Sequence, residues 1–215
     1  MDVRLRVNEI FHSLQGESTQ AGRPCTFVRL TGCPLRCTYC DTAYAFHDGE
    51  WMTLAAVLEA VASHPARLVE VTGGEPLAQP GAIPLLHALV DAGYEVLLET
   101  SGALPIGAVP AGVRRIVDLK TPGSGEVERN DWSNLQQLRP GDEIKFVIGS
   151  RADYEWAHAI AHEHRLHERV PVLVSPVWEA GVARDLAAWV LSDGWPVRFQ
   201  IQLHKWIWPG VERGV

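Results

Sequence analysis

The chain has 215 residues and a formal net charge of −7, and 47% of its residues are hydrophobic. This length and this share of apolar residues suffice for one α/β domain with a substantial core and argue against a disordered chain. An acidic chain without a basic stripe is poorly suited to a phosphate backbone, so we expect a small-molecule substrate and no nucleic acid.

The cellular context follows from the N-terminus and the cysteines. The first residues, Met-Asp-Val-Arg-Leu-Arg-Val, lack the apolar core of a signal peptide, and no apolar stretch reaches the roughly 18 residues of a membrane-spanning helix. Three of the four cysteines share one short stretch, which does not fit a disulfide framework and indicates reduced thiols. We therefore expect a cytoplasmic protein with no membrane association.

Strand-like and helix-like stretches alternate along the chain. We expect strands at residues 7–11, 25–30, 68–72, 95–100, 114–120, 143–149, 170–175 and 197–203. Helices are expected at residues 54–63, 82–92, 131–138, 152–166 and 179–191, with Thr53 capping the first and Gly93 ending the second. Repeated strand–helix pairs imply parallel strands with right-handed crossovers, in a single domain over residues 1–215. The pairs are too few for a closed barrel, so an open, partial (β/α) barrel is the expected fold.

Three cysteines, Cys33, Cys37 and Cys40, lie in the sequence Thr-Gly-Cys-Pro-Leu-Arg-Cys-Thr-Tyr-Cys-Asp-Thr. Such closely spaced thiolates cannot all be buried apart, whereas one short loop can direct them toward a single centre. A tetrahedral zinc site or a four-cysteine cluster needs a fourth protein ligand, and Cys25 lies in an apolar strand. Three ligands from one loop suit a [4Fe–4S] cluster with one open iron. The alternatives are a zinc site completed by a histidine such as His47, or three reduced surface thiols.

The spacing Cys-x3-Cys-x2-Cys, with Tyr39 directly before the last cysteine, resembles that of the radical S-adenosylmethionine (SAM) enzymes. The resemblance implies a partial-barrel fold in which the loop at residues 31–42 holds a [4Fe–4S] cluster and its open iron binds SAM. In that family the cluster reduces SAM, and the resulting 5′-deoxyadenosyl radical abstracts a hydrogen atom from the substrate.

Polar residues follow nearly every expected strand, at the end where parallel α/β proteins place their sites. Thr72-Gly73-Gly74-Glu75 resembles the Gly-Gly-Glu element whose backbone binds the SAM amino group in radical SAM enzymes. Two glycines allow the backbone to approach a ligand where a Cβ atom would clash, although an ordinary turn would also explain this stretch taken alone. The other polar strand ends are Glu99-Thr100-Ser101, Asp118-Leu119-Lys120, Ser175-Pro176 and Gln202-Leu203-His204-Lys205.

The stretch Glu-Ile-Phe-His-Ser-Leu-Gln-Gly-Glu at residues 9–17 resembles the signature of the 7-carboxy-7-deazaguanine synthases, a family of radical SAM enzymes. Cys40-Asp41-Thr42, Arg29 and the closing His204-Lys205 match that family as well. One departure is Ser18, where the family usually has glycine, and it removes no contacting group. Taken alone, the Gln-Gly-Glu stretch would also fit a solvated surface turn.

The resemblance covers nearly the whole chain and implies a carbon–nitrogen lyase. That family contracts the ring of 6-carboxy-5,6,7,8-tetrahydropterin to give 7-carboxy-7-deazaguanine and ammonia, on the route to 7-deazapurines such as queuosine. The radical abstracts the hydrogen from C6, and SAM is regenerated, so SAM acts as a cofactor. The resemblance also implies Mg²⁺, an electron donor such as flavodoxin or ferredoxin, and a homodimer.

The same resemblance assigns roles to individual residues. The positions that match substrate contacts are Leu14, Gln15, Gly16, Glu17, Arg29, Thr72 and His204. The positions that match the SAM site are Tyr39, Cys40, Asp41, Gly74, Ser101, Asp118, Lys120 and Ser175. Thr42 matches the Mg²⁺ ligand, with Asp41 as a competing candidate. Arg29 is a cation able to face the substrate carboxylate, and Gln15 and Glu17 offer the donors and acceptors that a pterin edge requires.

Two other classes of protein compete with this interpretation. A non-catalytic iron–sulfur or zinc module would use the same cysteines, and only an enzyme's reduced cluster would cleave SAM. A glycyl-radical activase would share the cluster loop but needs a protein partner and has no use for the Gln-Gly-Glu stretch. Trp206, Ile207 and Trp208 form a candidate apolar patch for a dimer interface.

Overall fold

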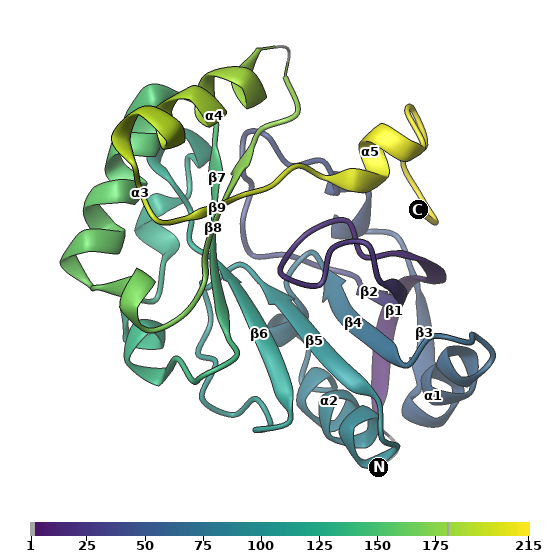
Figure 1. Ribbon diagram of the computed structural model, residues 1–215. Helices are drawn as coiled ribbons and strands as arrows, with labels where there is room; N and C mark the ends of the chain where they lie inside the picture. Colours follow the sequence, from purple (N-terminus) through teal and green to yellow (C-terminus); the bar gives the residue numbers. More distant parts are fainter. Residues whose placement is uncertain (1–2, 180) are drawn as a thin grey trace.

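The computed structural model describes residues 3–179 and 181–215, which form one open sheet with helices on its outer side (Figure 1). The strand order is β3-β1-β2-β4-β5-β6-β7-β8-β9, and all neighbours from β2 to β9 are parallel. Because the order has two free ends, the expectation of an open partial barrel is confirmed.

The bounds of the elements follow the expected alternation closely. The strands are β1 (Arg4–Leu14), β2 (Pro24–Leu30), β3 (Glu50–Thr53), β4 (Leu68–Gly73), β5 (Glu95–Thr100), β6 (Val113–Asp118), β7 (Glu143–Ile148), β8 (Val172–Pro176) and β9 (Arg198–Phe199). The α-helices are α1 (Leu54–Ala62), α2 (Ala82–Asp91), α3 (Arg151–Glu163), α4 (Val182–Asp193) and α5 (Leu203–Ile207). The helix expected at 131–138 is a 3₁₀ helix, Trp132–Gln137. Position 180, inside the helix expected at 179–191, lies outside the described residues.

The expected parallel strands run from β2 to β9, whereas the edge of the sheet at β1 is antiparallel. The β1 strand pairs antiparallel with both β2 and β3. A loop without a helix joins β1 to β2, and a chain that reverses without a crossover can pair only antiparallel. The short β3 strand was not expected, because a single four-residue stretch carries too little periodicity to be recognised.

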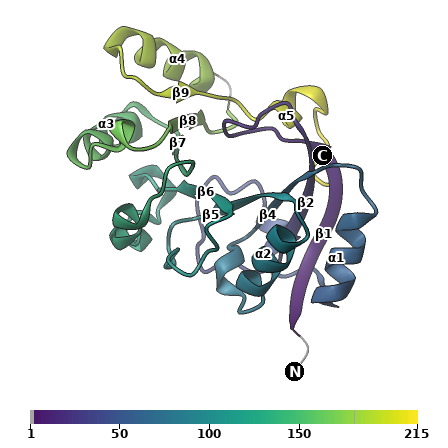
Figure 2. The same ribbon diagram turned by 60° about the horizontal axis from the view of Figure 1, so that its bottom comes forward.

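The predicted helix ends depend on local hydrogen bonds that the structure contains. The Thr53 hydroxyl accepts a hydrogen bond from the Ala56 amide at 3.2 Å and so caps α1. After α2, Gly93 adopts a φ of 81°, a left-handed conformation that favours glycine at the end of a helix. Figure 2 shows α1 to α4 on the outer side of the sheet. The inner side is therefore left open by α1 and α2.

The inner face of the sheet changes character along the strands. Successive side chains point to opposite faces, and the outward set packs against the helices. Its central members are Val28, Val71, Leu98, Val117, Phe146 and Val174. Near the amino ends of the strands the inward set is apolar: Phe11, Cys25, Phe27, Leu68, Leu97 and Ile116. Toward the carboxyl ends it becomes polar and lines a cavity, with Arg29, Glu70, Thr72, Glu99, Asp118, Lys145 and Ser175.

The chain after β8 departs from the expectation. A strand was expected at residues 197–203, but β9 covers only Arg198–Phe199, and α5 begins at Leu203. The amide of Leu203 donates to the carbonyl of Gly16 at 3.1 Å, so the chain leaves the sheet to pack against the loop after β1. Within the described residues, no helix is long and apolar enough to cross a membrane.

Candidate functional site

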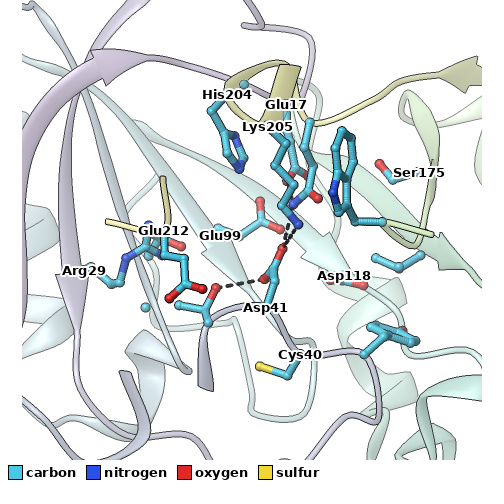
Figure 3. A pocket seen from close by; sticks show the side chains of 18 of the residues that line it. Glu17, Arg29, Cys40, Asp41, Glu99, Asp118, Ser175, His204, Lys205 and Glu212 are labelled. Atoms are coloured by element: carbon cyan, nitrogen blue, oxygen red, sulfur yellow. Dashed lines mark hydrogen bonds and ion pairs between the residues drawn. The ribbon is translucent and has the colours of Figure 1, made fainter. Parts of the chain in front are cut away.

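A cavity of about 870 Å³ lies at the carboxyl ends of the parallel strands (Figure 3). Its walls include every residue to which the sequence assigned a substrate, SAM, cluster or Mg²⁺ role. The strands supply the floor, the loop at residues 31–42 supplies one side, and α5 with the residues that follow it supplies another. The parallel arrangement explains the gathering, because it brings the carboxyl ends of all these strands to the same edge.

The three cysteines of the loop at residues 31–42 line this cavity, whereas Cys25 does not. Cys33, Cys37 and Cys40 are partly exposed, and all four thiols are free. Burial raises the pKa of each of the three loop thiols, in Cys37 to about 11, so the site favours thiolates only when a bound cation stabilises them. Cys25 is completely buried in the small apolar cluster of the inner face.

The three loop thiols, which line one cavity, are suited to an iron–sulfur cluster. Among residues 3–179 and 181–215, no three His, Cys, Asp or Glu side chains converge as the ligands of one metal ion do. A [4Fe–4S] cluster binds each thiolate to a different iron, so its ligands surround it instead of meeting at a point. A single zinc ion would need four converging ligands.

The Gly73-Gly74 turn after β4 packs against the protein's own cysteine loop. A Cβ atom on Gly74 would overlap the carbonyl oxygen of Gly32, and one on Gly73 would overlap that of Leu30. Gly73 also has a φ of 146°, which favours glycine. The Glu75 amide donates to the Gly32 carbonyl at 2.8 Å. The two glycines therefore allow the turn at residues 73–74 to pack directly against the backbone of residues 30–32.

Glu75 follows this turn and joins it to the end of β5. Its carboxylate is completely buried and accepts hydrogen bonds from the Thr100 hydroxyl at 2.9 Å and from the Ser101 amide and hydroxyl at 2.6 and 2.5 Å. It also accepts from the Leu77 amide at 2.9 Å. Glu75 therefore fixes the position of Ser101, one of the residues that match the SAM site.

Asp118 and Lys120, at the end of β6, bring charge close to the cysteines. Lys120 Nζ lies 2.9 Å from Asp118 Oδ2, and among the described residues Asp118 Oδ1 has no hydrogen-bond partner. Burial opposes the charge of Lys120, but Asp118 outweighs it and raises the pKa of the amine. A buried carboxylate oxygen without a donor beside a fixed cation suits the hydroxyl and ammonium groups of SAM.

The floor of the cavity carries an ion network centred on Lys145, a residue in the middle of β7. Its amine lies 3.0 Å from Glu17 Oε2 and 2.5 Å from Glu99 Oε1. Burial opposes the charge of Lys145, but the two carboxylates outweigh it and raise the pKa of the amine well above its usual range. Burial also raises the pKa of Glu99, whereas Lys145 and Gln202 overcome burial and lower that of Glu17. The site therefore holds Glu17 ionised.

Gln15 is held by hydrogen bonds on both sides of its amide. Its Nε2 atom donates to Glu70 Oε2, and its Oε1 atom accepts from the Glu17 amide at 3.0 Å. Gln15 is only 3% exposed and lines the cavity, and the contact with Glu70 uses one of the two hydrogens on its amide nitrogen. Burial, with the neighbouring Glu17, raises the pKa of Glu70 to about 7.

The loop after β1 and helix α5 form one wall together. A Cβ atom on Gly16 would lie 2.5 Å from Nδ1 of His204, so a larger residue there would displace the imidazole. Ser18 has a φ of 64°, which explains why a glycine is usual there, and its amide donates to Gln200 Oε1 at 2.8 Å. Burial lowers the pKa of His204, so a neutral imidazole faces the cavity.

Asp41 links the cysteine loop to α5. Its Oδ2 atom accepts from Lys205 Nζ at 2.5 Å and from Gln202 Nε2 at 3.0 Å, and its Oδ1 atom accepts from the Thr42 hydroxyl at 2.9 Å (Figure 3). Burial opposes ionisation of Asp41, but Lys205 outweighs it and lowers the pKa of the carboxyl. Two oxygen ligands suited to a hard cation, on Thr42 and Asp41, therefore lie side by side.

Several cavity residues were not singled out from the sequence. Glu70 and Lys145 lie within buried parallel strands, where a charged side chain among apolar neighbours is itself the signal. Tyr44 was missed because it belongs to no motif, although its hydroxyl donates to Glu9 Oε1 at 3.0 Å. Trp208 was expected on an exposed apolar patch, but it lines the cavity, while Trp206 and Ile207 are exposed as expected.

Comparisons with known proteins agree with the geometry. The family model described as the Radical SAM superfamily matches residues 27–168. A 7-carboxy-7-deazaguanine synthase of Koribacter versatilis is 44% identical over 98% of this chain and 100% of its own length. One of Chlorobaculum tepidum is 46% identical over 98% of this chain and 97% of its own.

Solved structures show the same fold. QueE from Escherichia coli superposes with a TM-score of 0.72 at 24% identity and covers 93% of this chain. SuiB from Streptococcus suis bound to S-adenosylmethionine superposes with a TM-score of 0.54 over 80% of the chain. With its cysteine loop, its open parallel sheet and relatives that match over nearly their full length, the chain belongs to the 7-carboxy-7-deazaguanine synthase family of the radical SAM superfamily.

Proposed function

We propose that this protein is a carbon–nitrogen lyase that converts 6-carboxy-5,6,7,8-tetrahydropterin into 7-carboxy-7-deazaguanine and ammonia, on a route to 7-deazapurines such as queuosine. The observation that carries the proposal is the nearly full-length identity of 44–46% to two 7-carboxy-7-deazaguanine synthases. The cavity supports it, because the residues that match that family's contacts line one continuous space. The glycyl-radical activase and the non-catalytic module are not favoured.

The cluster and SAM would occupy the side of the cavity formed by the cysteine loop. Cys33, Cys37 and Cys40 would hold the [4Fe–4S] cluster. When bound, the cluster and SAM supply the radical that removes a hydrogen atom from C6 of the substrate. The residues that would bind SAM are Tyr39, Cys40, Asp41, Gly74, Ser101, Asp118, Lys120 and Ser175. The protein's own contribution on this side is to fix the cofactor beside the substrate and to exclude water.

The substrate would occupy the side formed by β1, β2 and α5. The guanidinium of Arg29 would bind the ionised substrate carboxylate through charge-assisted hydrogen bonds, which are stronger than those between neutral groups. Glu17 and Gln15 would bind the polar edge of the pterin ring, with Leu14, Gly16, Thr72 and His204 completing the walls. The ionised Glu17 is a suitable acceptor for the ring N–H groups.

Mg²⁺ would bind where the two sides of the cavity meet. Thr42 is the proposed ligand, and Asp41 is the competing one, because their oxygen atoms are hydrogen-bonded to each other at 2.9 Å. With few protein ligands, the ion would bind well only when substrate oxygens and water complete its coordination. Its function would be to hold the substrate carboxylate so that C6 faces the cofactor.

The protein would work in the cytoplasm as a homodimer supplied with electrons by flavodoxin or ferredoxin. The exposed aromatic patch of Trp178 and Trp206 supports an interface, since the two rings pack edge to face at 6.0 Å with much of their surface in water. Large exposed apolar side chains that lie together are typical of interaction surfaces.

The function is tested by anaerobic reconstitution of the protein with iron and sulfide, followed by incubation with SAM, a reductant and the carboxytetrahydropterin. Mass spectrometry should detect 7-carboxy-7-deazaguanine, with SAM consumed in much smaller amount than product is formed. A colourless protein that binds zinc would support the non-catalytic module. A brown protein that cleaves SAM but forms no product would refute the proposed substrate while leaving the radical SAM chemistry intact.

A further inference from the structure

Glu9 is the first residue of the signature at residues 9–17, and nothing in the sequence assigned it a role. Its side chain is 15% exposed and lies on β1 directly opposite Arg29 of β2 in the strand register. Glu9 Oε1 accepts from Arg29 Nε at 2.6 Å and from the Tyr44 hydroxyl at 3.0 Å. Glu9 Oε2 accepts from the amide of Gly214 at 3.1 Å. One carboxylate therefore joins a cavity residue to the residues after α5.

This contact engages one specific nitrogen of Arg29. A guanidinium has one Nε and two terminal amino groups, arranged as a planar fork that matches a carboxylate. Glu9 takes Nε, and within residues 3–179 and 181–215 the terminal amino groups of Arg29 donate no hydrogen bond to the protein. The fork is therefore left for a ligand, and its plane is set by the partner at Nε.

The surroundings restrict the guanidinium further. Its central carbon lies 5.6 Å from the centre of the Phe11 ring and 5.8 Å from that of Tyr44, so it is bounded by two aromatic side chains. Tyr44 in turn bonds to Glu9, and the Arg213 guanidinium carbon lies 4.3 Å from the Tyr44 ring centre. Glu9 is therefore the polar centre of an assembly that restricts the orientation of Arg29.

We propose that Glu9 is a positioning residue that directs the terminal amino groups of Arg29 toward the carboxylate of the substrate. The inference rests on the proposed function, because it needs a carboxylated substrate beside Arg29. Without Glu9 the arginine keeps its charge but loses the hydrogen bond that fixes its plane. The variant then binds a carboxylate through one hydrogen bond at a time instead of two parallel ones. Glu9 thus selects carboxylated pterins over those that lack the group.

The test measures the binding of two probes to the reconstituted protein by calorimetry: the carboxytetrahydropterin and tetrahydropterin without the carboxylate. Glu9→Ala should weaken binding of the carboxylated probe about tenfold, the effect of losing one charge-assisted hydrogen bond. It should leave binding of the other probe unchanged. Glu9→Gln retains an acceptor for Nε and should recover part of the loss. In turnover the KM should rise more than kcat falls.

Matched variants separate positioning from damage to the fold. Arg29→Ala should reduce the preference for the carboxylated probe at least as far as Glu9→Ala does. Glu95→Gln disrupts another arginine–glutamate pair, the exposed contact of Arg23 with Glu95 at 2.9 Å, and should change neither affinity. Parental affinity of Glu9→Ala for the carboxylated probe would overturn the inference, as would an equal loss for both probes.

The two proposals can fail separately. If the parent protein makes no 7-carboxy-7-deazaguanine, the proposed function fails. The comparison of the two probes in the Glu9 variants still reports whether Glu9 directs Arg29, because it measures binding and not turnover. If the parent makes the product but Glu9→Ala retains the parental preference between the probes, the inference fails and the function stands.

Discussion

At the scale of single residues, the surroundings of the four cysteines differ. Cys33, Cys37 and Cys40 line the cavity, whereas Cys25 is completely buried beneath it. We expect alanine at any of the three loop positions to abolish the cluster, because each thiolate binds a different iron. Cys25→Ala should keep it, at a cost of about 1 kcal/mol in stability for the lost buried group. Iron analysis and visible absorption after reconstitution measure the cluster content of each variant, and normal iron content in Cys37→Ala would contradict the assignment.

Thr42→Val tests the Mg²⁺ site, because valine keeps the shape of threonine and removes the oxygen. We expect the variant to retain the cluster and to lose most of the Mg²⁺ stimulation of product formation, since misplacing the reacting atoms is costly. SAM cleavage without substrate should depend less on Mg²⁺. Thr38→Val is the control: its hydroxyl lies in the same loop but donates to the Gly123 carbonyl at 2.8 Å. The parental Mg²⁺ dependence in Thr42→Val would point to Asp41 instead.

Glu70 should make the stability of the protein depend on pH. Burial raises its pKa from 4.5 to about 7, so between these values the folded protein keeps a proton that the unfolded chain has released. The stabilisation is complete below about pH 4.5 and is lost as the pH rises through about 7. The side chain in Glu70→Gln stays neutral and retains an acceptor for Gln15. This variant should therefore not lose stability as the pH rises through this range.

Scanning calorimetry of the reconstituted proteins between pH 5 and 8 measures this difference. The melting temperature of Glu70→Gln relative to the parent should rise with pH across this window. Glu59→Gln, at an exposed position on α1, is the control and should follow the parent at every pH. A constant difference between Glu70→Gln and the parent would show that Glu70 has the same pKa in the folded and unfolded states.

At the scale of elements, α5 depends on contacts made outside the helix. It has five residues, too few for a stable helix in isolation, and is held by the Lys205–Asp41 ion pair at 2.5 Å. Because Asp41 is 45% exposed, the pair should contribute only about 1 kcal/mol. We expect Lys205→Met to speed amide exchange in residues 203–208 about fivefold.

Hydrogen exchange with mass spectrometry reads this effect peptide by peptide. Arg165→Met disrupts a more exposed ion pair, Arg165–Glu168 near the end of α3, and serves as the control. It should leave exchange in α5 unchanged. Equal protection of α5 in Lys205→Met and the parent would mean that its backbone contacts, such as the one from Leu203 to Gly16 at 3.1 Å, suffice.

The elements also show what could be predicted from the sequence. The strand at Glu95–Thr100 was predicted with its observed bounds, because apolar residues between turn signals describe a buried strand well. The strand predicted at 197–203 fails because Val-Arg-Phe-Gln-Ile-Gln-Leu alternates as a strand would, yet contacts with the loop after β1 draw its second half away. Local periodicity carries no information about such distant contacts.

For the candidate site, too, some residues could be predicted from the sequence and others could not. Residues in motifs were found because the chemistry of their types and spacing is recognisable, as in Cys33, Cys37 and Cys40. Glu70 and Lys145 were missed because they are single charges inside strands, and only the pairing of strands brings them beside Glu17 and Gln15. Glu9 was noticed as part of a motif, but its partner in the neighbouring strand depends on the register.

At the scale of the whole molecule, the exposed tryptophans bear on assembly. Trp206 is 64% exposed and Trp178 is 54% exposed, and they lie together. If they form the core of the proposed dimer interface, Trp206→Ser should weaken the dimer by at least about 2 kcal/mol, as expected for an aromatic side chain at an interface centre. Sedimentation velocity measures the change.

Leu191→Ser is the matched control for this prediction. Leu191 on α4 is 82% exposed, so it tests whether removing any exposed apolar side chain has the same effect. We expect its sedimentation to match that of the parent. A dimer of parental stability in Trp206→Ser would exclude this patch as the interface.

The packing of Gly73 and Gly74 on the cysteine loop has a consequence for how the enzyme can change. The spacing between this loop and the turn after β4 is set by peptide groups in direct contact, which substitutions elsewhere leave in place. Most side chains that would bind the substrate come instead from β1, the loop after it, β2 and α5. Evolution or engineering can therefore adapt that half of the cavity to another ring system while the cofactor half keeps its dimensions.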